Sequence, residues 1–195
     1  MTATADTLRR AVMMAMTALP LAGGAASTER NVQRMRRGSS VLVAYYSRSG
    51  NTRVVAGLIQ RALEAELFEI QPARPYPDDY LATVEEARKE RDGGRERALA
   101  ARVADVGRYE TVFLGFPIWG ETAPPVIRAF LSAHDLSGKV LIPFVTHGGY
   151  GLGNSQMALA RSAPRARIQQ GFAMEADQER RTMNQVNAWL KSVNA

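Results

Sequence analysis

From Val41 to the C-terminus, short runs of apolar residues alternate with segments whose apolar residues recur at helical spacing. The apolar runs predict five strands, at residues 41–46, 66–71, 109–116, 140–145 and 167–174. The first, third and fourth are almost entirely apolar, which indicates strands that are buried on both faces. The fifth is more polar and is expected at a sheet edge. Strands of this kind, separated by helices, predict an α/β fold with a parallel sheet covered on both faces.

The segments between the strands carry helical patterns. Helices are expected at residues 51–65, 124–131, 155–163 and 177–193, and the prolines at 124 and 125 suit a first helical turn. Residues 71–107 are irregular and contain a charged run at 85–91, which predicts a loop followed by a solvated helix with several opposite-charge pairs. In such a sheet, ligands bind at the carboxyl ends of the strands where the strand order reverses. The loops after the first, third and fourth strands are therefore the candidate site.

Residues 1–38 have a different composition from the domain predicted at residues 39–195. Arg9 and Arg10 precede an apolar run at residues 11–21, and small residues follow at 22–27. A charged start, a short apolar stretch and a small-residue site are typical of a secretory signal, and the arginine pair is weakly reminiscent of twin-arginine export. The alternative is that the natural chain starts at Met35, just before the first strand. Export to the periplasm follows from the first reading and a cytoplasmic location from the second.

The composition excludes several kinds of chemistry. The chain has no cysteine, so disulfides, iron–sulfur clusters, thiolate zinc sites and a cysteine nucleophile are excluded. His134 and His147 are the two histidines, too few for a histidine-rich metal centre. Of the net charge of +6, residues 1–38 contribute +4, with six arginines against Asp6 and Glu29. The remaining +2 gives no indication of nucleic-acid binding, and the apolar run at residues 11–21 is too short for a membrane span.

The loop after the first strand has the composition of a phosphate-binding site. It reads Ser47-Arg48-Ser49-Gly50-Asn51-Thr52 and leads directly into a predicted helix. A helix start binds anions through its unpaired N–H groups and the positive end of its dipole, and the three hydroxyls can each donate to a phosphate oxygen. Plain helix capping explains one or two of these residues but not the whole set. The loop lacks the spaced glycines of a dinucleotide motif and the lysine of a Walker loop.

Four blocks in order give the chain a recognisable pattern. Tyr46-Ser47-Arg48-Ser49-Gly50-Asn51-Thr52 follows the first strand, and Phe116-Pro117-Ile118-Trp119-Gly120 follows the third. Asp135-Leu136-Ser137-Gly138-Lys139 precedes the fourth strand, and Pro143 to Gly151 ends it with Thr146-His147-Gly148-Gly149-Tyr150-Gly151. Together they resemble the short-chain bacterial flavodoxin-like family over about residues 39–195. The resemblance implies a flavodoxin-like doubly wound five-stranded parallel sheet, with order 2-1-3-4-5, that binds FMN.

The resemblance also implies which residues hold the cofactor. The phosphate would lie in the loop of residues 47–52. The flavin ring would lie between the two later loops, with Pro117, Ile118, Trp119 and Gly120 on one side and Thr146, Gly148, Gly149, Tyr150 and Gly151 on the other. Trp119 is expected to lie against the ring, with a role as a rim or core anchor as the alternative. Tyr150 is a candidate second stacking partner, and the alternative for it is simple solvent exposure.

The two histidines have minor expected roles. His147 is a candidate proton donor near the flavin, although a loop histidine is more often only a hydrogen-bond partner. His134, before Asp135 at a predicted helix end, is expected to interact favourably with the dipole of that helix. We nominate no catalytic acid, base or nucleophile and no metal ligand.

Three functions remain open at this stage. The leading one is electron transfer by a flavin that a redox partner protein reduces or oxidises. The second is an FMN-dependent NAD(P)H:quinone-type reductase of a small-molecule acceptor. The third is a flavin-free binding module on the same fold. Carriers usually surround the flavin with acidic residues, and a domain charge of +2 weakens that reading.

Overall fold

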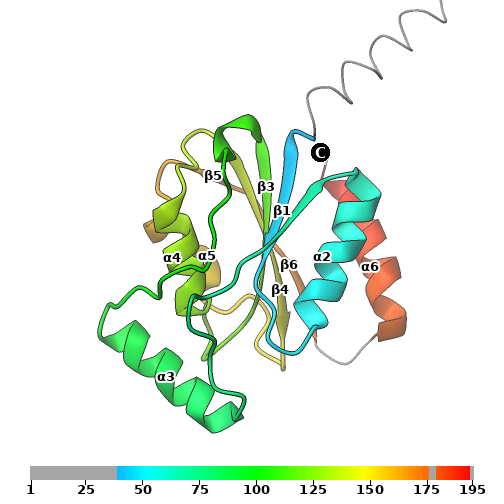
Figure 1. Ribbon diagram of the computed structural model, residues 1–195. Coiled ribbons are helices and arrows are strands. Elements are labelled where there is room, and N and C mark those ends of the chain that lie inside the picture. The colour runs from blue at the N-terminus through cyan, green and yellow to red at the C-terminus, as the bar shows by residue number, and fades with distance from the viewer. Residues whose placement is uncertain (1–38, 176–178, 194–195) are drawn as a thin grey trace, which may run out of the picture. The chain divides into compact units, whose positions relative to one another are not determined.

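The structure is a computed structural model that describes residues 39–175 and 179–193, and these form a single sheet with helices on both faces (Figure 1). The strands are β1 (Val41–Tyr45), β2 (Glu66–Glu69), β3 (Thr111–Pro117), β4 (Val140–His147), β5 (Arg167–Ile168) and β6 (Phe172–Glu175). The helices are α2 (Asn51–Leu63), α3 (Tyr80–Asp92), α4 (Pro125–Ala133), α5 (Ser155–Ser162) and α6 (Glu179–Ser192), with a short 3-10 turn at Val106–Arg108. The strand pairs are parallel and follow the order β2-β1-β3-β4-β5. The predicted fold class is confirmed, whereas the predicted signal segment lies outside the described residues.

Both faces of the sheet are buried, which explains the continuous apolar runs. Leu42 and Ala44 of β1 belong to a core that includes residues of α4 and α5, and Val43 and Tyr45 belong to a second core that includes residues of α2 and α6. Figure 1 shows α2 and α6 on one side of the sheet and α4 and α5 on the other. Alternate residues of each central strand therefore enter opposite cores, as parallel strands require. None of the described helices combines the length and hydropathy needed to cross a membrane.

A glycine in the middle of the sheet marks a close approach between β3 and β4. Gly115 pairs with Phe144 in the β3–β4 register. A Cβ atom at Gly115 would lie 2.1 Å from Cζ of Phe144. The ring of Phe144 therefore occupies the space of the missing side chain, and any larger residue at position 115 would displace it.

The edge strand predicted at residues 167–174 is present but interrupted. β5 pairs with Val140 and Leu141, and β6 resumes the pairing at Phe144. The N–H of Gln169 donates to the carbonyl of Leu141. The backbone groups of β4 therefore point toward the edge strand at position 141 and again two residues later, at position 143. Position 143 is a proline and has no N–H to offer there. Three residues of the edge strand, 169–171, face two of β4, which is a bulge opposite the missing donor.

His134 is buried at the end of α4 in a way that requires a neutral ring. Its Nε2 accepts the N–H of Val103 at 3.0 Å, and its Nδ1 lies 2.7 Å from the carbonyl of Phe130. With Nε2 as the acceptor, Nδ1 carries the proton and donates to the helix end. Burial lowers the pKa of His134 below its usual 6.5. The expected contact with the helix end exists, but as a hydrogen bond from a neutral imidazole instead of a charge at the dipole.

We predict that His134 makes folding stability depend on pH. The unfolded chain takes up a proton near pH 6.5, whereas the folded chain resists it, so stability is complete above that pH and falls as pH falls toward the lowered pKa. Urea unfolding at several pH values should show this decline in the natural protein. It should be absent in His134→Gln, whose amide keeps a donor and an acceptor. An equal decline in the variant would contradict this assignment.

Candidate functional site

Three loops converge where β1, β3 and β4 end. They are residues 46–50 before α2, residues 118–124 before α4 and residues 148–154 before α5. From β1 the chain continues to β2 on one side of it, and then crosses to β3 on the other side. The strand order therefore reverses between β1 and β3. Ligands in sheets of this type bind at such a reversal, outside the carboxyl ends of the strands. All of the predicted cofactor residues lie in or beside these loops.

The first loop presents an uncapped helix start. Gly50 is the N-cap residue of α2, with φ 97° and ψ −21°, and no side chain makes a capping hydrogen bond to this helix start. This left-handed conformation favours glycine. The N–H of Gly50 donates to Oγ of Ser47 at 3.1 Å, and the side chains of Arg48 and Ser49 are exposed. The first N–H groups of α2 are thus left for an external acceptor, which is the arrangement that binds anions.

Thr52 and Thr146 form a buried polar contact beneath that helix start. Their hydroxyl oxygens are 2.8 Å apart, and the residues are 1% and 4% exposed. The carbonyl of Thr146 also accepts the N–H of Ile118 at 2.8 Å. One residue at the end of β4 therefore connects the first loop and the second. Thr52, which we expect to donate to a phosphate, has a protein partner here, so it also positions the helix start.

The second loop contains a tight turn with two left-handed residues. The N–H of Trp119 donates to the carbonyl of Thr122 at 2.9 Å, and Gly120 and Glu121 have φ 56° and 65°. This is a type I′ geometry, in which a residue with a Cβ atom is strained. The carbonyl of Glu121 accepts the N–H of Asn154 at 2.8 Å. The turn is thereby fixed to the third loop.

Trp119 is held by two tyrosines. Its ring centroid lies 5.6 Å from that of Tyr46 and 4.9 Å from that of Tyr76, both edge to face at 86°. The guanidinium of Arg97 lies 3.7 Å above the ring of Tyr76. Burial raises the pKa of Tyr46 to about 12 and also raises the pKa of Tyr76, so both phenols stay protonated at neutral pH. The structure thus gives Trp119 the anchored position that was the alternative to stacking, and leaves the stacking role a prediction.

Arg97 connects this aromatic cluster to α3. It is 8% exposed and forms ion pairs with Glu86 and Glu90. Its Nη1 also donates to the carbonyl of Arg74 at 2.6 Å. The solvated helix predicted from the charged run is confirmed, but two of its carboxylates face inward onto this arginine. Sequence reasoning missed Tyr76 and Arg97, because nothing in a run of mixed charges marks which residue is buried.

The third loop is open to solvent. Gly149 and Gly151 have φ 114° and 58°, and Tyr150 is 63% exposed. Nδ1 of His147 accepts the N–H of Gly149 at 3.0 Å, which is the hydrogen-bonding role expected of most loop histidines. Gly153 has φ 52°, and a Cβ atom there would lie 2.2 Å from the carbonyl oxygen of Glu121. A larger residue at 153 would therefore separate the second and third loops.

A cleft of about 520 Å³ lies beside the first loop. Its walls include Tyr46, Ser47 and Arg48 on one side and Tyr76 and Asp78 on the other. Nη2 of Arg48 donates to the carbonyl of Asp78 at 2.6 Å across it. The described residues contain no group of three or more side chains able to hold a metal ion.

Comparisons with known proteins agree with this geometry. The family model described as flavodoxin matches residues 40–193. A crystal structure from Bacteroides eggerthii, of a protein provisionally described as a flavoprotein, is 31% identical, with a TM-score of 0.71 over 81% of this chain and 99% of that one. A similar protein from Bacteroides uniformis is 30% identical, with a TM-score of 0.70 over 79% and 99%. A Lactobacillus acidophilus flavoprotein in complex with FMN shares the fold at 21% identity and a TM-score of 0.63, covering 75% and 99%. No curated protein matches the chain.

We predict that Thr52 and Thr146 are energetically coupled. Thr52→Val or Thr146→Val leaves the other buried hydroxyl without its partner and should lower the free energy of unfolding by about 1–3 kcal/mol. The double variant should cost less than the sum, because it removes both groups. Urea denaturation measures all three, with Thr111→Val, a half-buried threonine of β3, as the control. Strictly additive costs would show that the two hydroxyls do not interact.

Proposed function

The chain belongs to the flavodoxin family, and on that premise we propose that it binds FMN and transfers electrons through it. When bound, the flavin supplies the redox chemistry and accepts one electron or two. The observation that carries the proposal is the uncapped start of α2 at the end of β1, beside the reversal of strand order. The rest of the proposal concerns how the residues of this chain would hold the cofactor.

The first loop has the donors that a phosphate monoester needs. The hydroxyl of Ser49 is exposed, and the first-turn N–H groups of α2 receive no side-chain cap. The left-handed Gly50 leaves space around it, with no atom within 4 Å of where a Cβ would lie. Ser47 accepts one hydrogen bond from Gly50 and can still donate its own proton. Neutral hydroxyls and backbone donors at a positive helix end stabilise a dianion without a lysine.

The second and third loops supply surfaces of different character for the flavin ring. Trp119, Gly120 and the backbone of Ile118 lie on the side that two tyrosines and a backbone hydrogen bond hold in place. Gly148, Gly149, Tyr150 and Gly151 lie on the open side. An anchored wall combined with an exposed aromatic residue suits a flat ligand that must remain accessible to an electron donor. Within this proposal Thr146 and Pro117 support the walls from the ends of their strands.

The charge of the domain favours keeping a second candidate. Residues 39–195 carry a net charge of +2, whereas carriers that dock on redox proteins usually depend on a strong field of one sign. A reductase that passes electrons to a small acceptor has no need of such steering. The chain has no dinucleotide motif, so electron transfer with a redox partner protein remains the first proposal.

We predict that Ser49→Ala weakens FMN binding by about 1.5–3 kcal/mol, the range for a hydrogen bond to a charged group. The natural protein should be yellow as purified, and Ser40→Ala, an exposed serine before β1, should bind FMN as it does. Titration calorimetry with FMN and riboflavin measures the phosphate contribution, which should shrink only in the Ser49 variant. A colourless, well-folded protein that refuses FMN would leave the flavin-free module as the better reading.

The two redox candidates differ in turnover without a partner. We predict that the flavin-loaded protein mixed with NAD(P)H and a quinone turns over slowly, because no pyridine-nucleotide site is evident in the sequence. Steady-state rates with a panel of small acceptors measure this. Fast turnover in the absence of any partner protein would favour the reductase and contradict the carrier proposal.

A further inference from the structure

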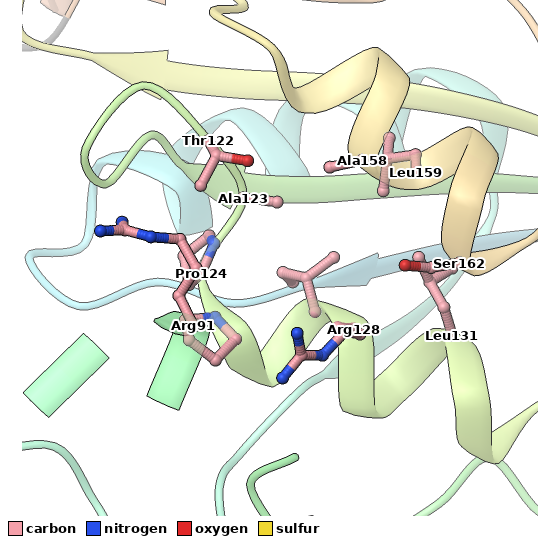
Figure 2. Close-up of a pocket in the computed structure, with 11 residues that line it drawn as sticks. Arg91, Thr122, Ala123, Pro124, Arg128, Leu131, Ala158, Leu159 and Ser162 are labelled. Carbon is pink, nitrogen blue, oxygen red and sulfur yellow. The ribbon is translucent and has the colours of Figure 1, made fainter. Parts of the chain in front are cut away.

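A furrow runs between α4 and α5 on the face of the sheet away from α2 and α6. It contains an inner cavity of about 110 Å³ and an outer one of about 630 Å³. The two share Arg91, Thr122, Arg128, Ala158 and Ser162, so they adjoin. Figure 2 shows Leu159 and Ala158 of α5 across the inner cavity from Arg128 of α4, with Thr122 and Pro124 at one end.

The inner cavity is lined mostly by apolar side chains, apart from Arg91, Thr122, Arg128 and Ser162, which it shares with the outer one. Pro124, Pro125, Ile127 and Leu131 line the inner cavity from the α4 side, and Leu159 lines it from α5. All five are buried, and Ile127, Leu131 and Leu159 belong to the core, so their positions are fixed by packing. A ligand portion that lies among these five side chains must be small and apolar, because a polar group would lose its water there without finding partners.

The outer part is basic. Arg91, Arg128 and Arg161 line it, against the single carboxylate of Glu96, which already accepts a hydrogen bond from Ser132. Within residues 39–175 and 179–193, neither Arg128 nor Arg161 takes part in an ion pair.

The two arginines keep most of their donors available to a ligand. Nη2 of Arg128 donates to the carbonyl of Arg95 at 2.5 Å, and its Nε is buried without a hydrogen-bond partner. Among the described residues, Arg161 has one hydrogen bond, a weak one to the sulfur of Met157 at 3.5 Å. The other guanidinium N–H groups of both arginines have no hydrogen-bond partner in this part of the chain, and these are the donors that a ligand could meet.

We propose that this furrow binds a small organic carboxylate, with its apolar body in the inner cavity and its carboxylate between Arg128 and Arg161. A carboxylate accepts bidentate hydrogen bonds from a guanidinium, and two arginines without ion pairs in the described chain suit a single negative charge. The inner cavity accommodates one ring of a compact aromatic acid, and the rest of the ligand lies in the larger outer cavity. This site goes beyond the proposed FMN site. It is formed by α4, α5, Arg91 and the second and third loops, not by the first loop, and Gly120 is the one proposed cofactor residue that lines it.

The test uses 2-naphthoate as the probe and 2-naphthalenemethanol, which has a similar shape without the charge, as its neutral counterpart. Both are titrated into the full chain as purified, with binding followed by calorimetry and by amide shifts of Thr122, Ala158 and Ser162. We expect the acid to bind, the alcohol to bind about tenfold more weakly or not at all, and the shifts to cluster at these residues. No binding of naphthoate, equal binding of the alcohol, or shifts located elsewhere would each overturn the proposal.

Variants assign the charge to particular residues. Arg161→Met and Arg128→Met retain an apolar stem, and each should weaken naphthoate binding about tenfold while leaving the alcohol unaffected. Arg165→Met, an exposed arginine after α5 that lines neither cavity, is the matched control. Arg161 is exposed, so its variant carries the test if the Arg128 variant fails to fold. An unchanged affinity in Arg161→Met overturns the carboxylate assignment.

Two further arms separate this site from the alternatives. Inorganic phosphate at the same concentration should not displace naphthoate, and displacement would show a simple anion site in place of the proposed one. The titrations are repeated with flavin-free and FMN-loaded protein. Naphthoate binding to protein that takes up no FMN would support the furrow while the proposed function fails, so the two outcomes are distinguishable.

Discussion

The candidate site depends on one buried contact between hydroxyl groups. Thr52 is the second residue of α2 and Thr146 is the last but one of β4, yet their hydroxyl oxygens are 2.8 Å apart in the interior. In a low-dielectric interior a satisfied polar pair is stabilising, whereas an unsatisfied one is costly, so the pair permits few other arrangements. Because the carbonyl of Thr146 also receives the N–H of Ile118, the geometry of two loops follows from the position of one residue.

A second chain of contacts supports the site from α3. Arg97 is buried between Glu86 and Glu90 and lies over the ring of Tyr76, which in turn contacts Trp119. A buried guanidinium is tolerated because two carboxylates and a backbone carbonyl compensate its lost hydration. The long segment between β2 and β3 is therefore part of the support for Trp119. The ion pairs of Glu86 and Glu90 with Arg97 explain why α3, whose other charged residues are solvated, packs against the domain.

Sequence patterns predicted the sheet and the loops better than the contacts between them. The apolar runs of β1, β3 and β4 could only be strands buried on both faces, and the Ser-Gly-Asn-Thr segment indicated an anion-binding helix start. Thr52 and Thr146 are 94 residues apart in the sequence, and no local sequence pattern predicts their contact. The neutral state of His134 depends on the N–H of Val103, which arrives from an irregular segment. The break between β5 and β6 has its cause in Pro143 of the neighbouring strand, so the sequence of the edge strand alone does not reveal it.

That break has a consequence for how the protein behaves when it is concentrated. The sheet ends on one side in a strand of two residues, a bulge and a strand of four, and on the other in β2, also of four residues with Glu66 and Glu69 at its ends. Long, flat borders with free N–H and carbonyl groups allow neighbouring molecules to add their own strands and polymerise. In the part of the chain that the structure describes, neither border offers a long, flat template of this kind. The proline that interrupts the ladder with the edge strand thus also shortens the border that a second molecule could extend.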